Sequence, residues 1–160
     1  MPISAEVVTL TLSGFMSGYY FSGAWVFTPA VIKAPPPLIA QQWRRAWDVG
    51  RYVGKFIVTS TAVSFTYLAY SEPAKFGNPR FQLLALAAGL VGSIVPFTII
   101  SSYPFNEAIN ERLGGVHGEI KASTDGKDLK QMVVDWGRLD YYRTLLALSG
   151  TLVGVTAILM

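Results

Sequence analysis

Four long apolar stretches, separated by short polar segments, dominate the pattern along this chain of 160 residues. A helix needs about 20 mostly apolar residues to cross the hydrocarbon core of a bilayer, and each stretch approaches or exceeds that length. They predict four transmembrane helices, at about residues 7–32, 52–70, 81–102 and 139–160. We therefore expect an all-α protein, a membrane four-helix bundle that occupies residues 1–160 as a single domain.

Small residues and prolines add detail to these spans. Gly14, Gly18 and Ser22 lie four residues apart in the first span, a spacing that lets another helix approach closely. The segment 33–37 ends in consecutive prolines, which terminate the first helix. Pro96 lies inside the third span, where we expect it to kink the helix.

Composition agrees with a membrane protein. Only 14% of the residues are charged, whereas soluble domains have roughly 25%. The net charge of +3 is small and the basic residues lie where loops are expected, which argues against a nucleic-acid partner. There is no cysteine, so disulfides and thiolate chemistry are excluded. The first span lacks the basic start of a cleavable signal peptide, and we expect it to be retained.

Lysine and arginine positions predict the orientation in the membrane. All of them except Lys75 and Arg80 lie in or beside the connections between the first and second spans and between the third and fourth. The positive-inside rule places both of these connections in the cytosol and both termini on the non-cytosolic side. We expect a multi-pass protein of the endoplasmic reticulum or another endomembrane.

Two polar clusters are predicted to emerge on the same side of the membrane. Trp136, Asp140 and Arg143 are four and three residues apart, so they share one face of a helix that leads into the fourth span. The second cluster follows the third span and consists of Tyr103, Asn106, Glu107, Asn110 and Glu111. Amides at the edge of an apolar cavity can hold a phenol, a carbonyl or a developing enolate by hydrogen bonds. The alternative is that they only cap the third helix and join it to the fourth.

Several residues compete for the role of a proton-transfer base. His117 is the only histidine, but it lies in a glycine-rich segment where an exposed side chain without a catalytic role is the alternative. Asp140, Glu107 and Glu111 compete with it, because a carboxylate desolvated at the membrane edge gains basicity. Arg51 belongs to a basic and aromatic stripe that either anchors to anionic headgroups or faces the glutamates or an acidic ligand.

The remaining motifs give little support for a bound metal or cofactor. One histidine and no cysteine leave carboxylates and amides whose spacing matches no dedicated metal site. Phosphate-binding loops and dinucleotide-binding glycine patterns do not occur, and His117 is badly placed to be a haem ligand. If the protein is an enzyme, chemistry without a cofactor is the most economical hypothesis.

Motifs along nearly the whole chain resemble one family of small integral membrane proteins from polyketide pathways, the anthrone oxygenase-like family. The order and spacing of the motifs carry this resemblance more than any single one. They are Phe27-Thr-Pro29-Ala, Pro35–Pro37, Gln42-Trp43 with Gly50 downstream, Pro96-Phe-Thr98, Pro104-x-Asn106 and Trp136-x-x-Leu139-x-x-x-Arg143.

The resemblance implies a membrane-embedded monooxygenase that oxidises an anthrone to a quinone with O2 and without a bound metal or flavin. It implies that Arg143, Asn106 and Asn110 stabilise an enolate oxygen and that Trp136 packs against flat rings, with Asp140 or His117 as the base. Tyr103 and Arg51 complete the candidate substrate contacts. The expected partners are a lipophilic aromatic small molecule, O2, membrane lipid and, in a homo-oligomer, a second copy.

Two other functions are compatible with the same residues. The cavity could run a non-oxidative isomerisation or cyclisation of a lipophilic polyketide, because fold does not determine the reaction. Alternatively, the protein is a non-catalytic membrane scaffold with its polar clusters on the outer surface. A closed apolar pocket bordered by Asn106 and Arg143 would favour an enzyme.

Overall fold

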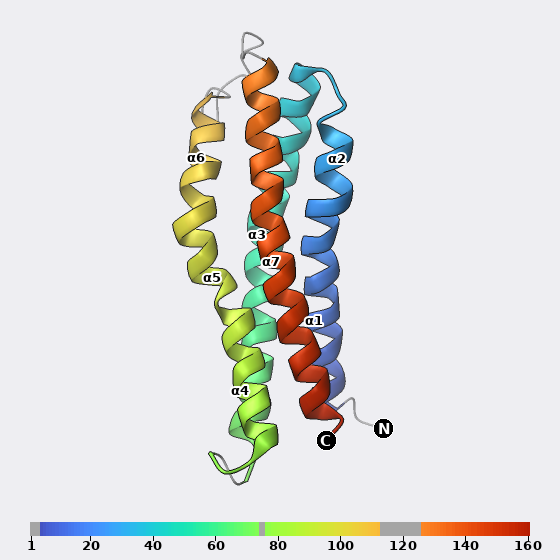
Figure 1. Cartoon of the computed structure of the whole chain (residues 1–160), viewed down its shortest axis with the longest axis vertical. Coiled ribbons are helices and arrows are strands. Elements are labelled where there is room, and N and C mark those ends of the chain that lie inside the picture. Colours follow the sequence, from blue (N-terminus) through green and yellow to red (C-terminus); the bar gives the residue numbers. More distant parts are fainter. Residues whose placement is uncertain (1–3, 74–75, 113–125) are drawn as a thin grey trace.

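A computed structural model of the chain describes residues 4–73, 76–112 and 126–160, and these ranges contain helices and no strand. The helices form four rods along the long axis of the molecule (Figure 1). The first rod is α1 (Ala5–Ser22), η1 (Gly23–Phe27) and α2 (Thr28–Val31), and the second is α3 (Pro36–Tyr70). The third is α4 (Pro79–Gly92), α5 (Ile94–Phe97), η2 (Thr98–Ser102) and α6 (Tyr103–Arg112), and the fourth is α7 (Gly126–Ile158). The predicted all-α class with four helices is confirmed.

Successive rods run in opposite directions. Both chain ends and the connection between α3 and α4 lie at one end of the molecule, at the bottom of Figure 1. The connection between α2 and α3 lies at the opposite end, together with the end of α6 and the start of α7. The helix ends that flank the two connections for which the sequence predicts a common side of a membrane therefore lie at the same end.

Local sequence explains where the rods begin and bend. The Ser4 hydroxyl accepts a hydrogen bond from the Val7 amide at 3.3 Å and caps α1, while Asn78 caps α4 in the same way through the Arg80 amide at 3.0 Å. Pro36 occupies the first turn of α3, where its missing amide hydrogen is not needed. The predicted kink in the third rod is present: α4 ends before Pro96 and the rod changes direction around α5 (Figure 1).

Two apolar clusters hold the rods together. The lower core joins all four rods and includes Met16, Phe65, Leu84 and Ala147. The upper core lies near the other end and includes Val31, Ile39, Trp43, Ile109, Leu129, Val133 and Trp136. The polar residues discussed below lie at or between these clusters.

Close helix contacts use different glycines from those that the sequence pattern indicates. A Cβ atom built on Gly14 or Gly18 would meet nothing within 4 Å, so these two glycines do not bring another helix of the described chain close. Ser13, Ser17 and neighbouring larger residues form the buried face of α1 instead. On α7, a Cβ atom on Gly150 would lie 2.8 Å from Val91, which shows a close approach to α4.

One helix of the described chain is long and apolar enough to cross a membrane. It is the third rod, Pro79–Glu111, and only 22% of its most apolar window is buried inside the protein. The other predicted spans are helical but do not meet the same criterion of length and hydropathy within the described ranges.

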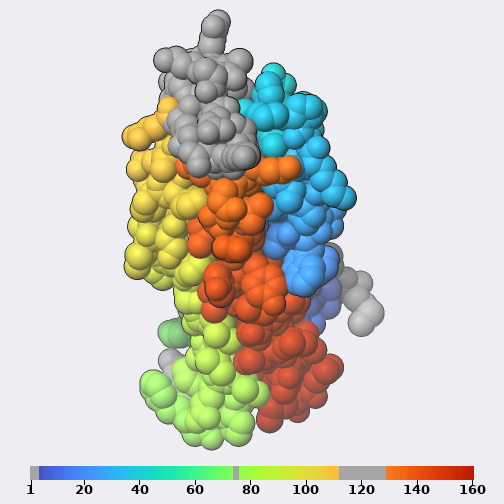
Figure 2. Space-filling model, turned by 45° about the horizontal axis from the view of Figure 1, so that its top comes forward, coloured from blue at the N-terminus to red at the C-terminus, as the bar shows by residue number. Residues whose placement is uncertain are grey.

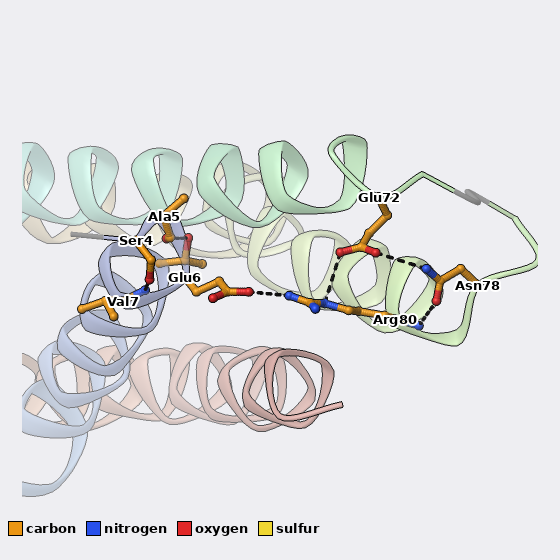
Figure 3. A network of polar contacts seen from close by, with 8 residues as sticks. Ser4, Ala5, Glu6, Val7, Glu72, Asn78 and Arg80 are labelled. Atoms are coloured by element: carbon orange, nitrogen blue, oxygen red, sulfur yellow. Dashed lines mark hydrogen bonds and ion pairs between the residues drawn. The ribbon is translucent and has the colours of Figure 1, made fainter. Parts of the chain in front are cut away.

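An ion-pair network ties the start of α1 to the connection between α3 and α4 (Figure 3). Arg80 pairs with Glu6 of α1, and its Nε lies 3.1 Å from Oε1 of Glu72. The Asn78 amide donates a second hydrogen bond to Glu72 at 3.1 Å. We call these four residues the end clamp.

We expect Arg80→Met to lower the free energy of unfolding by about 1 kcal/mol, because the end clamp is partly exposed to solvent. Thermal unfolding in detergent measures the change. Arg138→Met is the matched control, since Arg138 is 70% exposed and pairs only with Asp135 on its own helix among the described contacts. Equal shifts for the two variants would contradict a role of the end clamp in stability.

Candidate active site

A buried ion pair lies on α7. Asp140 and Arg143 are only 4% and 7% exposed, and the Arg143 guanidinium donates to Oδ1 of Asp140. The Thr144 hydroxyl donates to the backbone carbonyl of Asp140 at 2.8 Å. A buried ion pair is costly to desolvate and contributes little net stability, so its presence points to a role other than stability.

A glycine in the first rod makes room for the Asp140 carboxylate. A Cβ atom on Gly23 would lie 2.6 Å from Oδ2 of Asp140, closer than any side chain can come. Gly23 begins the π-helical segment η1, and its carbonyl accepts a hydrogen bond from the Thr28 hydroxyl at 2.9 Å. Short π-helical segments often occur at functional sites.

The Arg143 guanidinium also faces an aromatic ring of the first rod. Its Cζ lies 5.8 Å from the ring centroid of Tyr20, within the range of a cation–π interaction. Nε of Arg143 is buried and has no hydrogen-bond partner among the described residues. Arg143 is thus held in place by Asp140 and Tyr20 but keeps one donor unused.

Three polar side chains lie along one face of the third rod. Ser102, Asn106 and Asn110 are each one helical turn apart, and we call them the polar ladder. Ser102 is 0% exposed and Asn110 is 3% exposed, whereas Asn106 is half-buried. The side-chain oxygen of each has no hydrogen-bond partner among the described residues. Buried polar atoms are nearly always satisfied, so these three oxygens require an explanation.

Contacts between the third rod and α7 place one end of the polar ladder at the level of the ion pair. Val91 lies against Gly150, and the rings of Phe97 and Tyr142 are 6.3 Å apart. Ile109 belongs to the same upper core as Val133. These contacts define one antiparallel register, which brings Ser102 to the level of Asp140. Figure 2 shows the two rods side by side along one face of the molecule.

Aromatic rings surround the upper part of this region. The Trp136 ring lies edge-on to Trp43 at 6.4 Å and to Phe27 at 6.0 Å. Trp43 stacks on Trp47 at 6.2 Å, and its indole Nε1 is buried without a partner in the described part of the chain. Rings in such arrangements form a rigid apolar wall beside the polar ladder.

The other predicted site residues are placed less centrally. Arg51 lies between Trp47 and Tyr52 of its own helix, 4.6 Å and 4.8 Å from their ring centroids. Tyr103 is mostly exposed. Glu107 and Glu111 are also exposed. His117 lies outside the described residues.

Sequence reasoning did not single out Ser102 or Gly23 as site residues. Ser102 carries a usable signal, because it precedes Asn106 by one helical turn. Gly23 carries none, since only the packing of the first rod against α7 reveals its contact with Asp140. Among the described residues, no group of three or more His, Cys, Asp or Glu side chains is suitable for a metal ion.

Similarity to known proteins shows which family has this sequence. The family model described as anthrone oxygenase matches residues 43–153, which include the ion pair and the polar ladder. The chain belongs to the anthrone oxygenase family. This confirms the resemblance that its motifs indicate, and it shows that the protein is an oxygenase-like enzyme.

Curated relatives align with almost the whole chain. Anthrone oxygenase encC of Aspergillus fumigatus is 28% identical over 96% of this chain and 92% of its own length. Anthrone oxygenase AgnL2 of Paecilomyces divaricatus is 25% identical, with 94% and 93% covered. Monooxygenase hypC of Dothistroma septosporum is 23% identical, with 96% and 82% covered. No solved structure matches the chain.

Proposed function

We propose that this family member is a membrane-embedded, cofactor-independent oxygenase that converts an anthrone-type polycyclic aromatic polyketide to a quinone with O2. The observation that carries the proposal is the buried Asp140–Arg143 pair, with the unsatisfied polar ladder beginning at the same level and leading away from it. Relatives named anthrone oxygenase support the choice of substrate class.

The reaction balances without an external reductant. A base removes a benzylic proton from the ring carbon opposite the ketone and generates an electron-rich enolate. That carbon forms a C–O bond with O2, which gives a peroxide once it is protonated. Loss of the remaining proton from the same carbon, with cleavage of the O–O bond, leaves a carbonyl and releases water. One anthrone and one O2 thus become one quinone and one water.

The side chains supply the charges and hydrogen bonds that this sequence of steps needs. Arg143 stabilises the enolate oxygen by hydrogen bonds in a site that excludes water, and Asn106 and Asn110 bind other oxygen atoms of the substrate. The Trp136 ring packs against the flat substrate. Asp140 holds the Arg143 guanidinium in place, and either Asp140 or His117 accepts the benzylic proton.

The outer surface supports a position within the bilayer. Each rod presents large apolar side chains that are mostly exposed, for example Phe15, Phe56, Ile100 and Leu152. Apolar surface of this extent on every rod is suited to lipid contact and would be a liability in water. We place the α2–α3 connection on the cytosolic side and both termini opposite, in an endomembrane that would also dissolve the lipophilic substrate.

We expect purified protein, treated with a metal chelator, to consume one O2 for each quinone formed from an anthrone. With isotopically labelled O2, one heavy oxygen atom enters the quinone and the other appears in water. An oxygen electrode and mass spectrometry measure the two quantities. Conversion of the substrate without O2 uptake would indicate an isomerase or cyclase instead, and binding without turnover would indicate a scaffold.

A further inference from the structure

The hydroxyl of Ser102 differs from other serine and threonine hydroxyls in these helices. Ser64, Thr61 and Thr98 each donate to the carbonyl four residues earlier, at 2.7–2.8 Å. Such hydrogen bonds are the usual way to satisfy a hydroxyl within a helix. Ser102 is fully buried and has no partner in the described part of the chain.

A backbone carbonyl that could accept from the Ser102 hydroxyl lies within reach in its own helix. Ser102 is the last residue of η2, and the carbonyl of Thr98, four residues earlier, accepts the amide hydrogen of Tyr103. A carbonyl oxygen can accept two hydrogen bonds, as that of Gly23 does from the amide and the hydroxyl of Thr28, but the Ser102 hydroxyl does not donate to Thr98. By the register described above, the Ser102 hydroxyl lies at the level of Asp140, at the end of the polar ladder nearer the ion pair.

We propose that Ser102 is a further substrate-binding residue and that the polar ladder recognises oxygen atoms along one edge of a planar polycyclic substrate. Successive groups of the ladder are about 5.4 Å apart, the pitch of a helix. This spacing suits two phenolic oxygens that flank a ring ketone. A hydroxyl and two amides can donate to a ketone or an enolate and accept from a phenol, so the ladder matches each of these groups.

The inference rests on the proposed function and makes it more specific. A ligand that lacks the matching oxygens leaves the buried polar groups of the site unpaired. Because unpaired buried polar groups are costly, the site discriminates strongly against such a ligand. The polar ladder therefore selects for oxygenated rings, whereas the aromatic wall around Trp136 accepts any flat ring system. The same oxygens also make the ligand-free protein less stable than one with an apolar face would be.

Ser102→Ala tests the inference because binding and stability should change in opposite directions. We expect the dissociation constant of the quinone product, measured by quenching of tryptophan fluorescence, to rise about tenfold, the effect of one lost hydrogen bond. The melting temperature of the ligand-free variant should be equal to or higher than that of the wild type. Ser102→Thr keeps a hydroxyl and should restore binding.

Two comparisons make this result specific. Ser101→Ala removes the neighbouring hydroxyl, which lies outside the polar ladder, and should change neither quantity. KM of Ser102→Ala should rise for an anthrone with hydroxyl groups on both sides of its ketone, but stay unchanged for unsubstituted anthrone. A lower melting temperature or unchanged quinone binding would overturn the role of Ser102. Failure of the wild type to oxidise either anthrone would instead refute the proposed function.

Discussion

Replacing Arg143 with methionine is expected to reduce quinone formation by about 100- to 1000-fold, the usual effect of removing one donor that stabilises a developing oxyanion. The variant should also be less stable by about 3–5 kcal/mol, because Asp140 would be left buried without its partner. Turnover with saturating anthrone and thermal unfolding in detergent measure the two effects. Wild-type turnover in this variant would remove Arg143 from the mechanism.

A double variant separates catalysis from stability. Replacing a whole buried ion pair with apolar residues of similar volume is often neutral or stabilising. Asp140→Leu combined with Arg143→Met should therefore regain much of the lost stability while quinone formation stays at the level of the single variant. Arg138→Met is the control on the same helix, because Arg138 is exposed. If the double variant regained activity together with stability, the ion pair would be structural.

Gly23→Ala is expected to reduce turnover by about 100-fold, the order of loss that a displacement of about 1 Å at a reacting group produces. The new Cβ atom would lie 2.6 Å from Oδ2 of Asp140, so the carboxylate must move and carry Arg143 with it. Gly23 has ordinary right-handed helical angles, so alanine causes no backbone strain there. The measurements are kcat and the melting temperature.

Gly14→Ala is the matched control on the same rod. Its Cβ atom would meet nothing within 4 Å, so turnover should be unchanged. Stability should rise by about 0.5–1 kcal/mol, because alanine is the better helix former. If Gly23→Ala and Gly14→Ala behaved alike, the contact between Gly23 and Asp140 would have no part in positioning the ion pair.

The linear pattern predicted much of the candidate site because its residues lie on single helices. Asp140 and Arg143 are three residues apart, and their partnership follows from helical spacing. Asn106 and Asn110 were predicted from the same periodicity. The spacing could not show that the Ser102 hydroxyl is buried without a partner among the described residues, since that depends on how the third rod packs in the bundle.

Small residues show the limit of such reasoning most clearly. Gly14 and Gly18 match the spacing of a helix contact, yet the close approaches are made at Gly23, Gly137 and Gly150. Which face of α1 turns inward depends on all its neighbours together, and Ser13 and Ser17 occupy that face. A local pattern contains no information about the partner helix.

The sequence alone determined the all-helical class, the four helices and the family, because hydrophobic periodicity and motif order are properties of a linear chain. Only the tertiary structure decided that Asp140 fits against Gly23, that Arg143 faces Tyr20 and that Ser102 lies at the level of the ion pair. Each of these relations joins different rods. Packing across the bundle sets how the rods are aligned with one another, and residue spacing within one helix carries no information about that packing.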